Sequence, residues 1–325
     1  MFVSVRGVLL NLARGAALGV VELVPGVSAG TLALVLGIYR QLIEAVAAVV
    51  ELLRVGLVRF VPARRPRTAA SAPPGMVPWT FLAAVVCGMA VAIVTFSHVI
   101  STLLERHPGR LLAFFFGAVL VSSLLPLLAV RRWRGLEIVA LVVAAAATFV
   151  LLGLAPGTAA GKPSLWYLLV SGGIAASVMI LPGISGSFVL LLLGPYPYVV
   201  SLVRQLPQAS AWLPLLIFAS GAAVGLATVA SGLRRLLQRA PGPTYAALAG
   251  LMLGSLRRLW PFLAPGSADA PHTSNLASAE KLSIDSLGAL PDGAMMPIVT
   301  AALGGTVLAA LGVAAARRYL RRSAA

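Results

Sequence analysis

The chain has 325 residues, of which 59% are hydrophobic and 10% charged, and its mean hydropathy of +0.97 predicts a polytopic membrane protein rather than a water-soluble domain. Its formal net charge of +16 comes mostly from arginines in short tracts beside apolar segments, a pattern that indicates membrane orientation and no nucleic-acid partner. The single cysteine excludes an intrachain disulfide, and three scattered histidines form no metal-binding pattern.

The first apolar segment is broken near its middle. Glu22 and Pro25 interrupt it before a cleavage site, so we expect no removable signal peptide. Residues 15–53 have the pattern of a helix, a break at Pro25-Gly26, a half-helix and a return. Because a Pro-Gly pair stops a continuous helix, and irregular backbone at membrane depth must be sheltered by protein, we predict a re-entrant hairpin here.

Further along the chain, a basic linker over residues 54–78 precedes a series of unbroken apolar stretches. Six of them are long enough to cross about 30 Å of hydrocarbon as helices. They are residues 79–100, 111–130, 136–154, 212–233, 244–263 and 296–316. A second re-entrant hairpin is predicted at 167–204 and an outer loop at 264–295. Counting crossings places four arginine tracts and both termini in the cytoplasm.

The two hairpins repeat one phrase: Pro-Gly-x-Ser, eight residues, then a glycine and, two positions later, a tyrosine. The copies are residues 25–39 and 182–196. Each half of the chain, 1–155 and 156–325, therefore has one hairpin followed by three crossings. Because three is odd, the second half enters from the opposite face. The expected fold class is an all-α polytopic membrane protein built from two inverted repeats, each a re-entrant broken-helix hairpin plus three transmembrane helices.

Beyond each break, a half-helix begins with Ser28 or Ser185 near its N-cap, which leaves backbone N–H groups and a positive dipole end deep in the bilayer. Two such ends entering from opposite faces predict an anion site, whereas any one serine or glycine alone is explained by capping or packing. The residues expected to line this site are Pro25, Gly26, Ser28, Gly30, Pro182, Gly183, Ser185, Gly186 and Ser187.

Helix ends alone do not hold a phosphate in the membrane. A charge at the bilayer centre costs at least ~3 kcal/mol, whereas one helix end returns only about 0.3 to 2 kcal/mol. Arg257 and Arg258 would add charge-assisted, bidentate hydrogen bonds. The alternative is that they extend to the lipid headgroups, with Trp260 as an interfacial anchor.

Glu22 is the one acidic residue inside a hairpin. We interpret it as a coupling or proton-binding residue, because burial of a lone carboxylate favours its neutral form. A structural ion pair with Arg14 is the alternative. Tyr39 and Tyr196 are predicted to end the half-helices at an interface. We expect no cofactor, no metal and no catalytic residue, with coupling to a proton or sodium gradient.

Four segments resemble the bacterial polyprenyl-phosphate transporters, a family long catalogued as a domain of unknown function. They are residues 15–39, 114–125, 182–196 and 250–261. The resemblance implies that undecaprenyl phosphate or a related polyprenyl phosphate moves from the outer to the inner leaflet of the bacterial cytoplasmic membrane. That movement recycles the carrier lipid for peptidoglycan and other envelope polymers. The partners implied are this lipid and the surrounding membrane lipids, and residues 54–78 are where the chain is most individual.

Two other classes are weighed against a transporter. An undecaprenyl-pyrophosphate phosphatase would need a nucleophile or base, a metal and cationic phosphate ligands. The first hairpin has one Glu rather than paired acids, no His follows Ser28, and no Arg follows Ser185. A channel or passive scaffold would instead tolerate changes at both serines.

Overall fold

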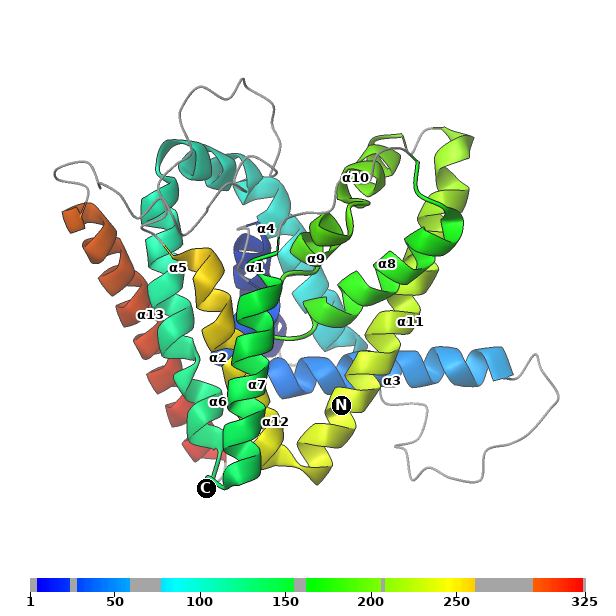
Figure 1. Cartoon of the computed structure of the whole chain (residues 1–325). Helices are drawn as coiled ribbons and strands as arrows, with labels where there is room; N and C mark the ends of the chain where they lie inside the picture. The colour runs from blue at the N-terminus through cyan, green and yellow to red at the C-terminus, as the bar shows by residue number, and fades with distance from the viewer. Residues whose placement is uncertain are drawn as a thin grey trace.

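The structure is a computed structural model that describes residues 5–23, 28–58, 77–154, 162–205, 208–260 and 295–323. Every regular element in these residues is a helix, and none is a strand (Figure 1). Most of the predicted basic linker and the predicted outer loop fall outside the described residues, as do Pro25 and Gly26.

The helices of each half follow the same order: a helix, a break, a half-helix and a third helix, then a long helix and the remaining helices. The first half contains α1 (Val5–Glu22), α2 (Ala29–Val35), α3 (Tyr39–Val58), α4 (Trp79–Arg106), α5 (Pro108–Ser122), α6 (Leu124–Ala129) and α7 (Gly135–Leu151). The second contains α8 (Leu165–Met179), α9 (Gly186–Leu193), α10 (Tyr196–Arg204), α11 (Ala209–Arg239), α12 (Pro241–Ser255), the 3-10 helix η1 (Leu256–Leu259) and α13 (Met295–Ser323). Both predicted breaks are present, although α1 begins ten residues earlier than expected and α3 extends into the predicted linker.

Three stretches in the described residues are long and apolar enough to span a membrane, rather than the six that we predicted. They are Trp79–Ile100, Gly109–Ala129 and Ala209–Arg239. The predicted span at 136–154 corresponds to the shorter apolar helix Gly135–Leu151. The one at 244–263 changes to a 3-10 helix after Ser255, and the one at 296–316 has its apolar part at Val299–Ala310.

Helices pair in the same way in the two halves. Within the halves, helix α1 packs along α4 and α8 along α11; across the halves, α5 pairs with α13 and α12 with α7. Close approach depends on small residues, as it commonly does in membrane helix packing. Gly88 of α4 lies directly against the backbone carbonyl of Leu12, and Gly221 of α11 lies against that of Leu169. A methyl group at either glycine would overlap the facing backbone, so both contacts require the absence of a side chain.

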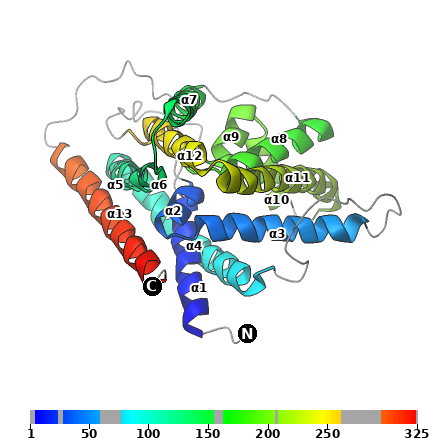
Figure 2. The ribbon, with the colours of Figure 1, turned by 90° about the horizontal axis from the view of Figure 1, so that it is seen from below.

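The largest buried cluster joins the two halves at the level of the breaks. It contains Leu18 and Ile38 from the first half together with Ile180, Leu233 and Leu248 from the second. Helix α3 lies across the bundle rather than returning along α2, and it contacts α11 (Figures 1 and 2). This in-plane course differs from the predicted return of a hairpin.

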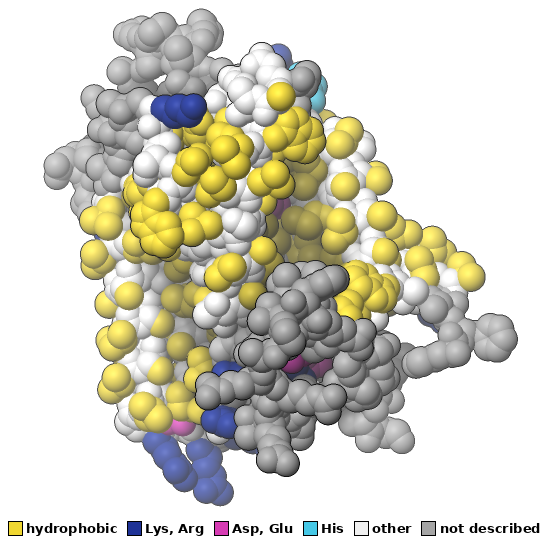
Figure 3. Space-filling model, turned by 90° about the vertical axis from the view of Figure 1, so that its right-hand side faces the viewer, with side chains coloured by type: hydrophobic (Ala, Val, Ile, Leu, Met, Phe, Trp, Pro, Cys, Tyr) yellow, Lys and Arg dark blue, Asp and Glu magenta, His cyan; other side chains and the backbone are white. Residues whose placement is uncertain are grey.

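The outer surface is largely apolar. Figure 3 shows hydrophobic side chains over much of one face, with the Lys and Arg side chains in view gathered mainly toward its upper and lower ends. Helix α4 contributes Val86, Val91 and Val94, which are 60%, 65% and 80% exposed. Such a belt of exposed aliphatic side chains with cations at its edges is what a lipid-facing surface requires. The protein is therefore a multi-pass membrane protein.

Candidate functional site

The first turn, between α1 and α2, and the second turn, between α8 and α9, meet inside the bundle. The hydroxyl of Ser28 donates to the carbonyl oxygen of Leu181 at 3.2 Å, and the backbone N–H of Gly183 donates to Thr31 Oγ1 at 3.0 Å. These bonds join residues that are more than 150 positions apart in the chain. Ser28 and Ser185 are 2% and 6% exposed, so both N-cap serines are buried.

In the described residues of the first turn, from Ser28 onward, the hydrogen-bonding groups have partners within the protein. Ser28 caps α2 by accepting from Gly30 N at 3.2 Å, while its own hydroxyl group donates to Leu181 in the second turn. The carboxylate of Glu22 accepts from Ala29 N at 3.3 Å. Thr31 N donates to the carbonyl of Ser28 at 2.9 Å. The first amides of α2 therefore already have acceptors.

Gly30 allows the first turn to approach the backbone of the second turn closely. A methyl group at Gly30 would lie 3.3 Å from both the carbonyl oxygen of Ile180 and the nitrogen of Pro182. That spacing is tight without being prohibitive. The small residue thus brings the two turns together, which is a packing role.

Thr31 and Tyr39 also hold the second turn, although the sequence did not single out Thr31. The Tyr39 hydroxyl donates to the carbonyl of Ile180 at 3.1 Å. The prediction that Tyr39 ends a half-helix at an interface is wrong, because it begins α3 and is only 3% exposed. Tyr196 begins α10 and is half-buried. Thr31 could have been found as the polar residue that follows Ser28 by one helical turn.

The second turn differs from the first in that its N-cap serine does not bond to the helix that it precedes. Ser185 precedes α9, but its side chain does not cap that helix, and its hydroxyl oxygen lies 2.7 Å from that of Ser187. The first amides of any α-helix have no acceptor within the helix. The second turn therefore places two hydroxyls and the amino end of α9 side by side.

Two glycines and a proline shape this second turn. Gly183 has a φ of +93°, a left-handed conformation that glycine adopts without strain. A methyl group there would lie 2.7 Å from the carbonyl oxygen of Leu251, and one at Gly186 would lie 2.7 Å from that of Ala175. Pro182 is fully buried. These three residues fit the turn between α12 and α8.

The two arginines of η1 point to different helices. Arg257 Nη1 donates to the carbonyl of Phe149 at 3.0 Å, and its guanidinium carbon lies 4.4 Å from the centre of the Phe149 ring. Arg257 is thus hydrogen-bonded to the C-terminal end of α7, where its positive charge complements the negative end of the helix dipole. The guanidinium carbon of Arg258 lies 4.7 Å from the ring centre of Phe188, the residue after Ser187. Of the two, Arg258 belongs to the second turn.

Trp260 and Glu22 complete the predicted set. Trp260 is 40% exposed and meets Phe116 edge to face, with ring centres 5.5 Å apart. Arg14 donates to Asn11 Oδ1 at 3.1 Å, so the structure does not show the alternative ion pair between Arg14 and Glu22, both of which it describes. Glu22 lies at the junction of α1 and α2, beside the first turn.

These features define a class: an all-helical, multi-pass membrane protein in which two broken helices meet within the bundle. Residues 18–275 match the model of a family described as undecaprenyl phosphate translocase-like, and the chain belongs to this family.

Two relatives are named polyprenyl-phosphate transporter. That of Vibrio cholerae serotype O1 is 34% identical over 257 residues, which cover 77% of this chain and 76% of the relative. That of Staphylococcus aureus is 30% identical over 267 residues, which cover 78% of this chain and 87% of the relative. No solved structure matches the chain.

Proposed function

We propose that this protein is a flippase that moves undecaprenyl phosphate, or a related polyprenyl phosphate, from the outer to the inner leaflet of the bacterial cytoplasmic membrane. The family and the names of the two relatives support the transporter role and the class of lipid. The observation that carries the proposal is the asymmetry of the two turns. In the first, the amides at the start of α2 are bonded internally, and the second presents Ser185, Ser187 and the start of α9 beside Arg258.

The second turn has the chemistry that a phosphate headgroup needs. Hydroxyl groups and helix N-terminal amides donate to phosphate oxygens, and a guanidinium supplies a fixed positive charge. The face of Phe188 orients Arg258 through a cation–π contact worth about 0.5 to 2 kcal/mol. Only the headgroup has to be sheltered, because the polyprenyl tail is as apolar as the lipid around it.

Movement of the headgroup would follow from two halves related by an inverted repeat. The matched pairing of α1 with α4 and of α8 with α11 supports that relation. In our proposal the halves rock about the contact of the two turns, so that the site opens to one leaflet at a time. The bonds from Ser28, Thr31 and Tyr39 to residues 180–183 would couple the two turns during this motion.

Glu22 is our candidate for the coupling residue. Its carboxylate accepts from the first amide of α2, so protonation would weaken a bond that stabilises the first turn. A Glu22→Gln variant keeps an oxygen acceptor but cannot change its charge. We expect its transport to be insensitive to an imposed proton gradient, whereas a sodium-coupled protein would respond to sodium in both forms.

The experiment for the proposed function uses purified protein in liposomes that contain labelled undecaprenyl phosphate. We expect redistribution of the label between leaflets faster than in empty liposomes. Equal rates with and without protein would refute transport. Release of phosphate from undecaprenyl pyrophosphate by the same preparation would favour the phosphatase alternative instead.

A further inference from the structure

The two broken-helix segments of the chain correspond at one constant shift of 157 positions, the separation of Tyr39 from Tyr196. The same shift relates the ends of α1 and α8, the starts of α2 and α9, and the starts of α3 and α10. It also relates two glycines with positive φ, Gly37 at +69° and Gly194 at +93°. Tyr39 and Tyr196 therefore occupy equivalent places in the two segments.

The apolar surroundings of the two tyrosines correspond as well. Tyr39 belongs to one buried cluster and Tyr196 packs against another, and several members of the two clusters are related by the same shift. The pairs are Leu18 with Ala175, Ala33 with Leu190 and Leu42 with Val199. Each ring thus lies in an apolar cluster built from the same positions of its own half.

The hydroxyl groups of the two tyrosines differ, however. Tyr39 is 3% exposed, and its hydroxyl donates to the carbonyl of Ile180 in the second turn at 3.1 Å. Tyr196 is half-buried, and its hydroxyl has no hydrogen-bond partner in the part of the chain that the structure describes. The counterpart of Ile180 is Leu23, which follows the last residue of α1. Carbonyls at such a helix end have no partner within the helix, so that of Leu23 suits a donor from elsewhere.

The N-cap serines show the same one-sided pattern. Ser28 donates across to Leu181, whereas its counterpart Ser185 bonds to Ser187 within its own turn. Three groups of the first half thus reach the second turn, and two of them, Ser28 and Tyr39, have counterparts that could reach back. In a transporter with inverted repeats, an exchange of conformation between the halves turns a site that faces one leaflet into a site that faces the other.

We propose that Tyr39 and Tyr196 are alternating positioning residues. In the state described here Tyr39 bonds to Ile180, and in an exchanged state, open to the other leaflet, Tyr39 releases Ile180 and the Tyr196 hydroxyl donates to the carbonyl of Leu23. This inference rests on the proposed function and specifies which bonds change as the halves rock: the two turns stay coupled, but through different donors in the two states.

The exchange is not fully symmetric. The counterpart of Thr31 is Phe188, whose side chain cannot accept the bond that Thr31 takes from Gly183. The exchanged state therefore has one bond fewer between the turns, and the state described here is the more populated of the two.

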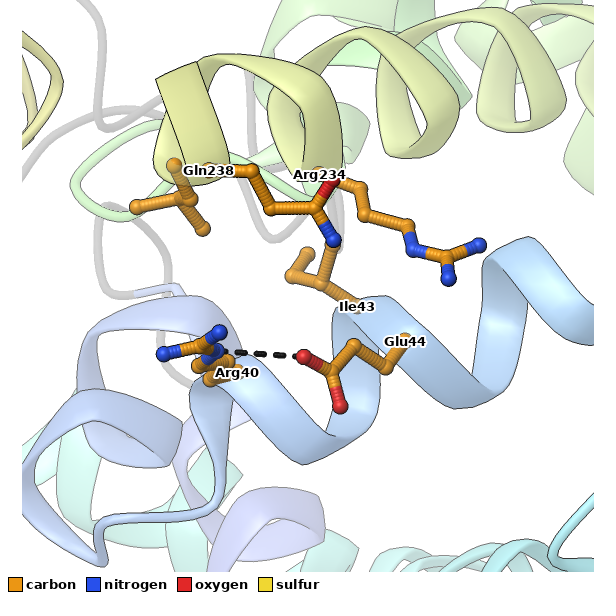
Figure 4. A pocket seen from close by; sticks show the side chains of 6 residues that line it. Arg40, Ile43, Glu44, Arg234 and Gln238 are labelled. Atoms are coloured by element: carbon orange, nitrogen blue, oxygen red, sulfur yellow. Dashed lines mark hydrogen bonds and ion pairs between the residues drawn. The ribbon is translucent and has the colours of Figure 1, made fainter. Parts of the chain in front are cut away.

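Spin labels on full-length protein in nanodiscs can measure the exchange, in a Cys87→Ala background because Cys87 is exposed. The labels occupy two pairs of exposed positions that correspond at the shift of 157: Arg40 with Val170, and Pro197 with Ala13. Labelling Arg40 removes only its ion pair with Glu44 (Figure 4), in which the side chains are 64% and 47% exposed. Such a pair contributes little to stability. Because the two label pairs trade places between the states, a change in population moves their distances in opposite directions.

Two conservative variants test the roles of the hydroxyl groups. Tyr39→Phe should lower the ratio of the described state to the exchanged state by a factor of roughly two to ten, the effect of one ordinary hydrogen bond. Tyr196→Phe removes a hydroxyl that is bonded only in the exchanged state, so adding it to Tyr39→Phe should return the ratio toward that of wild type. Tyr198→Phe is the control on α10, because its counterpart is Gln41 and it has no part in the exchange. It should leave the ratio unchanged.

The double variant decides the inference. If Tyr196→Phe leaves the ratio of the Tyr39→Phe protein unchanged, lowers it further, or acts no differently from Tyr198→Phe, the two hydroxyls do not alternate. Two merely structural tyrosines would give losses of stability that add rather than populations that compensate.

The leaflet assay separates this inference from the proposed function. Absence of wild-type transport would refute the flippase proposal, whatever the label distances. Wild-type transport together with label distances that neither Tyr39→Phe nor the double variant changes would refute only the exchange.

Discussion

Thr31 of the first half accepts a 3.0 Å hydrogen bond from the backbone N–H of Gly183 in the second half. Both residues are buried, and Gly183 adopts a left-handed conformation at this point. Thr31 thus supplies the acceptor for the backbone N–H of Gly183, beside the bonds that Ser28 and Tyr39 donate to Leu181 and Ile180. The relationship makes Thr31 a positioning residue for the second turn.

Replacement of Thr31 by valine should destabilise the protein by about 1 to 3 kcal/mol, because it leaves the buried N–H of Gly183 unpaired at nearly constant volume. Thr31→Ser keeps the acceptor and should lose less. Unfolding of both variants in the same detergent measures the difference. If valine and serine variants unfold alike, the hydrogen bond does not hold the turn.

The two N-cap serines should respond differently to alanine. Ser28→Ala removes a cap and a bond between the halves, so we expect a loss of about 0.5 to 2 kcal/mol in unfolding free energy. The double variant Ser185→Ala/Ser187→Ala removes hydroxyls that bond to each other and do not cap α9. It should therefore reduce binding of lipid phosphate more than stability. Unfolding and lipid-phosphate binding are measured on the same preparations, and a double variant that binds normally would remove the second turn from the proposed site.

The two arginines of η1 provide a matched pair. Arg258→Gln should lower the transport rate at least tenfold, since about 1.4 kcal/mol of lost headgroup interaction corresponds to a factor of ten. Arg257→Gln should mainly lower thermal stability, because its guanidinium is bonded to the end of α7. The leaflet assay and thermal unfolding, both measured on the two variants, distinguish a substrate ligand from a stabilising residue. The reverse pattern would assign the phosphate to Arg257.

Glycine packing between the paired helices can be tested with one methyl group. Gly88→Ala and Gly221→Ala should each cost about 1 to 3 kcal/mol, because the added carbon meets the backbone of the facing helix. Gly232→Ala is the control in α11, where an added methyl group has nothing within 4 Å and helix propensity favours alanine. Thermal stability should thus fall for the first two and hold or rise for the third. A fall at Gly232 that equals the others would mean that alanine is disfavoured for reasons other than contact.

Much of the helical layout could be predicted because it depends on local chemistry. Pro182-Gly183 stops a helix wherever it lies, and Ser185 marks the next helix start, so both breaks fell where the sequence placed them. Element ends were less certain. Helix α12 gives way to a 3-10 turn at Leu256 although we predicted that the span would continue to residue 263, since hydropathy alone does not indicate where a helix tightens.

The composition, the two breaks and the repeated Pro-Gly-x-Ser phrase were determined by the sequence, because residue type sets hydropathy and backbone freedom at each position. Which groups remain available was decided only by the tertiary structure. Ser28 and Ser185 occupy equivalent places in the repeat, yet one is bonded to Leu181 across the interface and the other to Ser187 beside it. A hydrogen bond depends on the partner that packing brings within about 3 Å, and the packing of two distant segments cannot be predicted from the sequence of either segment alone.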